Sequence, residues 1–223
     1  MGTQKLALLA LGGRATLFYL REINKRYQQK TAARVPCPML VKKTDFPKIN
    51  QFLPNQFSVL EEIAKTQLDR LQDSNKIVVP NITFHQAIDR LCEREGCSYP
   101  IVHPIKSVVN QLTSDDCKEI RLVSSHYGMN SEYLRSFFAE ADIEVTVPSE
   151  DDQMKIDEFR KKIYLFNETN HDVEEYLTLL SRYHQDSRVV IACTELSLCL
   201  PPNGGGFYDM ARAQIDQAMT AYD

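Results

Sequence analysis

The chain has 223 residues, of which 43% are hydrophobic and 25% charged, so it is long enough to bury the core of one large domain or of two small ones. Its formal charge of -4 and its lack of lysine- or arginine-rich blocks argue against binding to nucleic acid or to anionic membranes. The six cysteines are irregularly spaced and include no C-x-x-C pair, which argues against a metal site. No stretch approaches the roughly 18 apolar residues of a membrane span, so we expect a protein of the reducing cytoplasm.

The chain begins with a pattern typical of a strand, a glycine turn and a helix. Residues 6–11 are apolar and predict a buried strand, Gly12 and Gly13 predict a turn, and residues 14–29 predict a helix. A glycine turn between a strand and a helix can hold an anion through its N–H groups. A plain tight turn is the simpler interpretation, because neither G-x-G-x-x-G nor a P-loop sequence is present.

The rest of the first half predicts three more strands separated by helices. We expect a strand over residues 38–43, an irregular segment over 44–57, and a helix from Ser58 to about residue 71 that opens with a Ser58–Glu61 capping box. An apolar strand over 77–79 is followed by a polar stretch, with a helix over 83–95 and an edge strand over 99–105. His85 begins that helix, where it is either a packing residue or a catalytic one.

The second half repeats the alternation of strands and helices. The expected strands cover residues 119–125, 143–147 and 189–192. The expected helices cover residues 106–112, 130–141, 150–166, 171–183 with Asn170 as its cap, and 208–221. This alternation predicts an α/β protein with mostly parallel sheets flanked by helices. We expect two pseudo-symmetric subdomains, residues 1–105 with 207–223, and residues 106–206.

The apolar strand expected over residues 189–192 leads directly to Cys193. Reactive side chains in α/β sheets gather just past the carboxyl ends of strands, and N–H groups of the following turn can favour a thiolate there. A buried structural cysteine is the alternative interpretation, because free cysteine is among the most buried residue types. The local pattern leaves both interpretations open.

Taken together, the motifs resemble the aspartate/glutamate racemase family over nearly the whole chain. The similar segments are Cys193-Thr194-Glu195, Gly12-Gly13-Arg14-Ala15-Thr16, Thr44-Asp45-Phe46, the loop from Pro80 to His85, and the segment containing Asp209. The resemblance implies an active-site cleft between the two subdomains, no cofactor, a small acidic substrate and a homodimer. In that family two thiols flank the α-carbon of an amino acid, and one removes a proton while the other returns it on the opposite face.

The resemblance also implies a set of site residues. The catalytic set is Cys193, Thr83, Asn81 and His85, and the substrate-binding set is Gly13, Arg14, Thr16, Ile82, Ser125, Thr194, Glu195 and His171. The chain departs from the family at Asn81, where many members have the first thiol, because an amide is neither an acid nor a base near pH 7. It also has Gly128 where the family usually has a second threonine, and Gln214 in place of a histidine.

Three functions remain open on these residues. The first is a cofactor-independent racemase of aspartate or glutamate type, with Cys193 as acid and base and with Thr83, His85 or a water acting on the other face. The second is a lyase or decarboxylase of the same superfamily that protonates an enolate from one face with a single thiol. The third is a racemase-like protein that binds an acidic ligand or a protein partner without catalysis.

Overall fold

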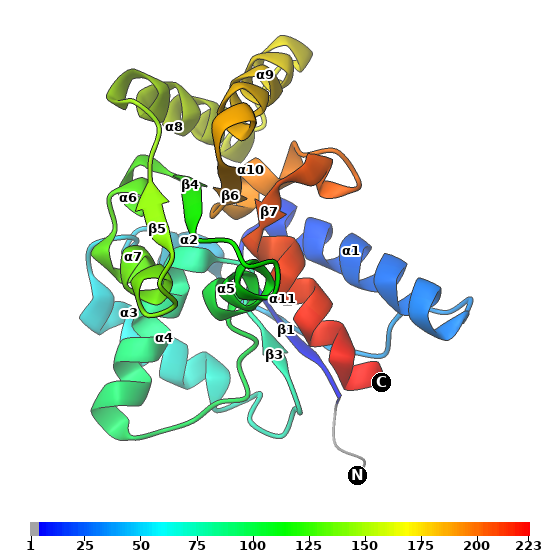
Figure 1. Ribbon diagram of the computed structural model, residues 1–223. Helices are drawn as coiled ribbons and strands as arrows, with labels where there is room; N and C mark the ends of the chain where they lie inside the picture. Colours follow the sequence, from blue (N-terminus) through cyan, green and yellow to red (C-terminus); the bar gives the residue numbers. More distant parts are fainter. Residues whose placement is uncertain (1–4) are drawn as a thin grey trace. The chain divides into compact units, whose positions relative to one another are not determined.

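The computed structural model describes residues 5–223, and the chain divides into two compact units (Figure 1). The first unit comprises the residues up to His103 together with Gln214–Asp223, and the second comprises Pro104–Ala213. The last division falls inside helix α11 (Met210–Ala218). Each unit is a parallel sheet flanked by helices, which confirms the predicted fold class.

The first unit is built on a three-stranded parallel sheet with β1 (Ala7–Ala10) at its centre. β2 (Leu40–Lys43) and β3 (Ile77–Val78) pair with its two edges, so that Leu8 lies opposite Val41 on one side and Val78 on the other. The helices of this unit are α1 (Gly13–Thr31), α2 (Phe46–Asn50), α3 (Phe57–Leu68), α4 (Ile82–Glu95), the end of α11 and the 3-10 helix η2 (Met219–Tyr222).

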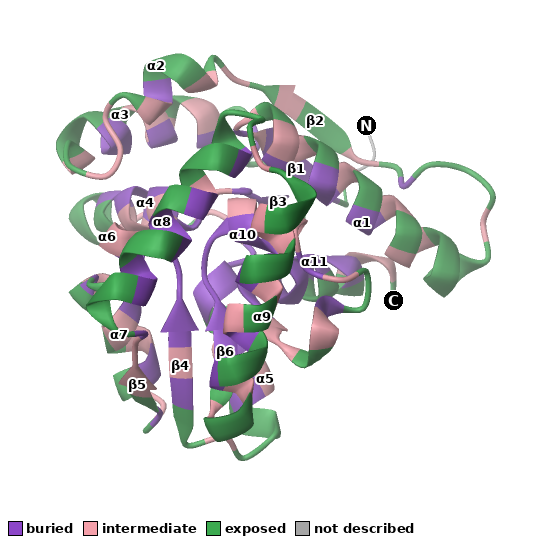
Figure 2. Cartoon of the chain, turned by 90° about the horizontal axis from the view of Figure 1, so that it is seen from above, coloured by how far each residue is buried: buried purple, intermediate pink, exposed green. Residues whose placement is uncertain are grey.

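The second unit is built on a four-stranded parallel sheet in the order β5-β4-β6-β7. These strands are β4 (Glu119–Val123), β5 (Glu144–Thr146), β6 (Arg188–Ile191) and β7 (Tyr208–Asp209). The helical segments are α5 (Pro104–Ser114), α6 (His126–Met129), α7 (Glu132–Ala139), α8 (Glu150–Tyr164), α9 (Asn170–Asp186), α10 (Thr194–Leu198), η1 (Gly204–Gly206) and the start of α11. Figure 2 shows buried residues along β4 and β6 and exposed residues along α8 and α9.

The structure corrects two predicted helix caps. The helix expected to begin with a Ser58–Glu61 capping box begins instead at Phe57, with no side-chain cap. Glu61 is 3% exposed and accepts a hydrogen bond from Arg90 Nε at 2.9 Å, so a tertiary ion pair replaces the local cap. Asn170 was predicted to cap the next helix, but Thr169 does so, in a capping box with Asp172.

Three predicted elements also differ from the observed ones. The segment expected as a strand over 99–105 forms only a bridge between Ile77 and Ile101, because two prolines remove backbone donors and α5 starts at the second. The helix expected over 130–141 is observed as the shorter α7, which Ser131 caps, and the short helix α6 precedes it. The segment expected as a helix over 208–221 begins with β7, and the segment expected to be irregular over 44–57 contains α2.

No helix within residues 5–223 is long and apolar enough to cross a bilayer.

Candidate active site

The loop after β6 places Cys193 at the carboxyl edge of the second sheet. β6 lies between β4 and β7, so the residues that follow these strands gather at one edge. Cys193 is the residue before α10 and has extended backbone angles of φ -149° and ψ 123°. Its side chain packs with the apolar core of this unit, and the residue is only 7% exposed.

The Cys193 thiol has a carboxylate partner. Its Sγ donates to Glu195 Oε2 at 3.3 Å. Burial, followed by the negative charge of Glu195, raises the pKa of Cys193 well above its ordinary value, while Arg160 and the Leu196 backbone N–H act in the opposite direction. The sequence left a thiolate-favouring turn and a buried structural cysteine both open; in the structure, burial and Glu195 outweigh Arg160 and the Leu196 N–H group, so the environment does not favour the thiolate. The thiol is therefore protonated at rest.

A cation on α8 lies close enough to oppose that effect. α8 packs against α10, and the Arg160 guanidinium interacts electrostatically with both Cys193 and Glu195. Arg160 Nε donates to Asp157 Oδ1 at 2.9 Å, and the same oxygen accepts the His126 N–H at 3.2 Å. Burial raises the pKa of Asp157, but hydrogen bonds from neighbouring basic groups outweigh burial and lower this pKa to about 2. Asp157 is therefore an anion, and its carboxylate holds Arg160 in place.

A buried polar network stabilises the loop that contains Cys193. Ser197 Oγ lies 3.1 Å from the Cys193 carbonyl oxygen and donates to Asp209 Oδ1 at 2.7 Å. Asp209 also accepts the Ala211 N–H at 3.0 Å and forms an ion pair with Arg212. Because both charged residues are more than nine-tenths buried, breaking this pair would leave an uncompensated charge. The network therefore fixes the backbone that carries the thiol.

Three further residues of the second unit belong to the same edge. Ser125 caps α6 by accepting the Gly128 N–H at 3.1 Å, and Ser124 Oγ donates to the Ala192 carbonyl oxygen at 2.7 Å. Thr194 is 3% exposed, and its Oγ1 has no hydrogen-bond partner within the described part of the chain. A buried hydroxyl without a partner next to the thiol is a donor available to a bound carboxylate.

The first unit has a corresponding polar edge after its three parallel strands. Gly12, with φ 70°, makes the turn after β1, and its carbonyl oxygen accepts the Thr16 N–H at 3.0 Å. Gly13 is exposed, and Arg14 and Thr16 are half-buried in the first turn of α1. The predicted substrate-binding residues Gly13, Arg14 and Thr16 thus lie at the same edge as Asn81, which follows β3.

Asn81 has a structural role in the first unit. Its Oδ1 accepts the Phe84 N–H at 2.9 Å, so its side chain caps α4. Ile82 is 6% exposed, and Thr83 is half-buried in the first turn of the helix. A helix cap thus accounts for asparagine at a position where the resemblance places a thiol.

His85 is completely buried in a chain of hydrogen bonds. Its Nδ1 donates to the Asn81 carbonyl oxygen at 2.8 Å, and its Nε2 accepts from Gln214 Nε2 at 3.4 Å. Gln214 also accepts from the Tyr19 hydroxyl at 2.7 Å and donates to the Val102 carbonyl oxygen. Burial, followed by the charge of His103, lowers the pKa of His85 to about 3, so the ring is neutral. The environment is that of a histidine which holds the loop in position.

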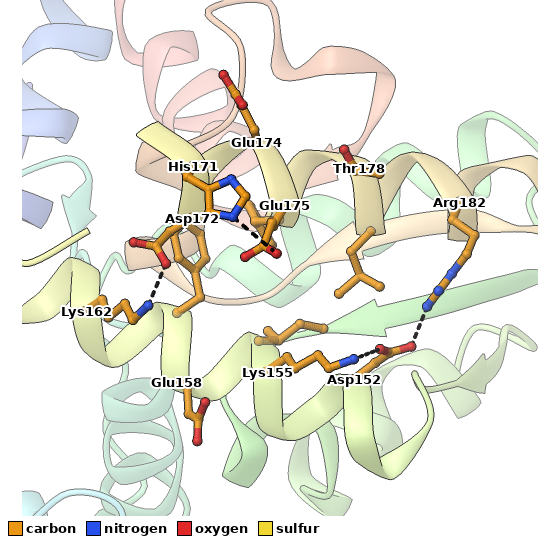
Figure 3. A pocket seen from close by; sticks show the side chains of 14 residues that line it. Asp152, Lys155, Glu158, Lys162, His171, Asp172, Glu174, Glu175, Thr178 and Arg182 are labelled. Atoms are coloured by element: carbon orange, nitrogen blue, oxygen red, sulfur yellow. Dashed lines mark hydrogen bonds and ion pairs between the residues drawn. The ribbon is translucent and has the colours of Figure 1, made fainter. Parts of the chain in front are cut away.

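His171 occupies a different part of the second unit. It lies in a groove of about 590 Å³ between α8 and α9, with its side chain 77% exposed and Nε2 3.6 Å from Glu175 (Figure 3). Lys162 pairs with Asp172 across the two helices. Neither Cys193 nor the strand ends around it line this groove, so the groove is not assigned as the active site.

Arg160, Asp157 and Ser197 were not predicted from the sequence. The two charged residues fall in an amphipathic helix, where charge usually indicates a solvent-facing side. Within residues 5–223, no group of three or more metal-ligating side chains could hold a metal ion.

The described features define an α/β protein of two parallel-sheet units, with a thiol and a carboxylate at the carboxyl edge of the second sheet. The profile of the family described as Asp/Glu/Hydantoin racemase matches residues 8–217, so the chain belongs to this family. No protein of curated function matches the sequence.

Solved structures share the fold at low sequence identity. An aspartate racemase homologue from Pyrococcus horikoshii OT3 is 18% identical with a TM-score of 0.76, and the match covers 99% of this chain and 100% of that one. The aspartate racemase of Picrophilus torridus is 15% identical with a TM-score of 0.73, covering 98% and 95%. An arylmalonate decarboxylase is 13% identical with a TM-score of 0.54, covering 97% and 92%.

Proposed function

We propose that this protein is a cofactor-independent enzyme that transfers a proton at the carbon next to a carboxylate, with Cys193 as acid and base. The observation that supports this most directly is the Cys193 thiol paired with Glu195 at 3.3 Å, at the carboxyl edge of β6. In the forward direction, Glu195 takes the proton from the thiol, and the resulting thiolate removes the proton from the α-carbon. In the reverse direction, the S–H group returns a proton to that carbon.

The neighbouring groups would stabilise the charge that develops in this step. Arg160 offsets the negative charge of the thiolate, since its guanidinium is held by Asp157. The Thr194 hydroxyl is available to donate to the substrate carboxylate as the carbanion forms. We expect aspartate or glutamate as the substrate, and racemisation as the reaction, because the chain belongs to a family of Asp/Glu racemases.

The first experiment measures exchange at the α-carbon. Each enantiomer of aspartate and glutamate is incubated with the protein in D₂O, loss of the α-proton is followed by NMR, and the enantiomers are separated by chiral chromatography. We expect deuterium at the α-carbon of both enantiomers. Cys193→Ser should abolish exchange, whereas the matched control Cys199→Ser should retain it. Exchange that survives in Cys193→Ser would refute the assignment of the thiol.

A second candidate is single-face protonation by a lyase or decarboxylase, and it is favoured by the capping role of Asn81. Since the asparagine side chain is engaged with Phe84 and has no acid–base function, only one competent thiol is assigned. An α-substituted malonate incubated in D₂O should then release carbon dioxide and give one deuterated enantiomer. A racemic product, or no release of carbon dioxide, would argue against this candidate.

Asn81→Cys tests whether a second thiol would support racemisation. The matched control is Asn81→Ser, which retains a helix-capping oxygen but supplies no thiol. If the family's two-thiol chemistry applies, Asn81→Cys raises racemisation above both Asn81→Ser and the native chain. Equal racemisation by the two variants would show that position 81 does not supply the second acid or base. A protein that shows neither exchange nor decarboxylation, yet binds an acidic ligand in an NMR titration, would be a binding protein.

A further inference from the structure

Two thiols outside the proposed active site lie in direct contact at the end of α4. Cys97 Sγ donates to Cys92 Sγ at a distance of 3.4 Å. Both residues are half-buried and pack against the core of the first unit, so a small molecule can reach them. Neither has a place in the chemistry proposed for Cys193.

The local backbone explains why these two side chains meet. α4 ends at Glu95, and Gly96 then adopts the left-handed conformation with φ 63° and ψ 27°. In helices that end with such a glycine, the residue after the glycine commonly contacts a residue in the last helical turn. Cys97 and Cys92 occupy these two positions. A pair of leucines would fill this contact equally well, but sulfur makes it chemically reactive.

The environment of Cys92 also differs from that of an isolated thiol. Burial, followed by the hydrogen bond and the charge of Cys97, raises the pKa of Cys92 to about 12, although the Tyr99 backbone N–H acts in the opposite direction. Because the thiolate is the reactive form, this raised pKa makes Cys92 a poor first nucleophile. The first attack on an oxidant falls to Cys97, and Cys92 is placed to resolve the product.

We propose that Cys92 and Cys97 form a redox-active dithiol that hydrogen peroxide oxidises to an intramolecular disulfide. The Cys97 thiolate attacks one peroxide oxygen, the O–O bond breaks, and one water leaves after protonation, which gives a sulfenic acid on Cys97. The Cys92 sulfur then attacks the Cys97 sulfur, the S–O bond breaks, the S–S bond forms, and the second water leaves. The two thiols lose two electrons and two protons in total, and peroxide is reduced to two waters.

The geometry suits this bond. A disulfide bond is about 2 Å long, so the two sulfurs need to approach by roughly 1.4 Å, and rotation about the side-chain bonds of two partly exposed residues can supply that movement. The bond would join the last turn of α4 to the segment that leads to Ile101, whose bridge to Ile77 continues the first sheet. Oxidation would therefore link the carboxyl end of α4 covalently and reversibly to the segment that continues the first sheet.

The test uses the reduced full-length chain and a trypsin site that lies between the two cysteines. After peroxide treatment, free thiols are blocked with N-ethylmaleimide and the protein is digested. Cleavage after Arg94 separates residues 91–94 from residues 95–106, so these peptides remain linked only if the disulfide has formed. We expect the linked pair at peroxide concentrations that leave Cys37 and Cys117 as alkylated thiols, and we expect dithiothreitol to separate it.

Three variants test how the pair works. Cys92→Ser should leave a sulfenic acid on Cys97 that dimedone traps, and Cys117→Ser should form the linked peptides at the native rate. Gly96→Ala retains both thiols but disfavours the left-handed turn, so disulfide formation should be roughly fivefold slower. The proposal is overturned if peroxide oxidises Cys97 to a sulfinic acid without linked peptides, or if Gly96→Ala reacts at the native rate. None of these measurements depends on the enzymatic activity.

Discussion

Gly128 occupies a position where a side chain would collide with the loop beside the thiol. An ideal Cβ built on Gly128 would lie 2.2 Å from Ser124 Oγ and 2.8 Å from Ser124 Cβ, both far below contact distance. The Ser124 hydroxyl cannot simply move aside, because it donates to the Ala192 carbonyl oxygen at 2.7 Å, next to Cys193. We therefore predict that Gly128→Ala destabilises the second unit and displaces the Cys193 loop.

The size of the effect follows from the two contacts. Overpacking of this kind costs about 1–3 kcal/mol, and loss of the Ser124 hydrogen bond adds about 1 kcal/mol, so Gly128→Ala should lower the free energy of unfolding by about 2–4 kcal/mol. Ser124→Gly removes the two atoms that would lie closest to the new Cβ, at the expense of the same hydrogen bond and some backbone entropy. In the double variant the overpacking disappears and the shared hydrogen bond is lost only once, so the coupling free energy between the two sites should be about 2–4 kcal/mol.

Urea denaturation of the four proteins, followed by circular dichroism, measures this cycle. The reasoning is refuted if the two substitutions are additive within about 0.5 kcal/mol, since the backbone would then have absorbed the Cβ without using the space of Ser124. The same result would remove the steric explanation for glycine at a position where the family usually has threonine.

Three further predictions concern the charges and caps of the two units. Glu195→Gln should lower the pKa of Cys193, because the negative charge of Glu195 raises that pKa. Alkylation of Cys193 by iodoacetamide should then reach half its maximal rate at a lower pH than in the native chain. An unchanged or higher pH of half-maximal alkylation would contradict the pairing of Glu195 with Cys193. The pKa of His85 is about 3 in the folded protein and about 6.5 in the unfolded chain. As the pH falls below about 6.5, only the unfolded state takes up the proton, so the free energy of unfolding should fall by about 1.4 kcal/mol per pH unit. That slope should be absent in His85→Gln and retained in the control His171→Gln, as measured by urea titrations between pH 7 and pH 5. Asn81→Ala should be about 1 kcal/mol less stable than Asn81→Ser, because serine restores the helix cap; equal urea midpoints would show that the cap is not used.

The sequence was sufficient for the parts of the fold that depend on local pattern. The β-branched run before Cys193 predicted β6, because such residues favour a strand buried on both faces. The alternation of strands and helices predicted the parallel sheets, since parallel strands need a crossover connection. The family resemblance implied Glu195 as a site residue, and the structure places its carboxylate beside the Cys193 thiol, where its charge raises the pKa of Cys193.

Features set by tertiary contacts could not be predicted in this way. Ser58 and Glu61 match a capping box, but Glu61 binds arginines of α4, about thirty residues further along the chain. Ser197 and Asp209 lie twelve residues apart, and only the pairing of β7 with β6 brings them together beneath the thiol. The contact between Cys92 and Cys97 had a local signal, the glycine before the second cysteine, whose meaning depends on where the helix ends.

The environment of Cys193 bears on which half of the proposed reaction is easier. Burial and Glu195 both favour the neutral thiol, so the resting site is prepared to donate a proton. Before it can accept one, the thiol must lose its proton to Glu195, and an incoming substrate carboxylate adds a further negative charge nearby. Arg160 is the cation that opposes this repulsion, and Asp157 holds it in place. Protonation of a carbanion by Cys193 therefore needs less rearrangement of charge than proton removal does.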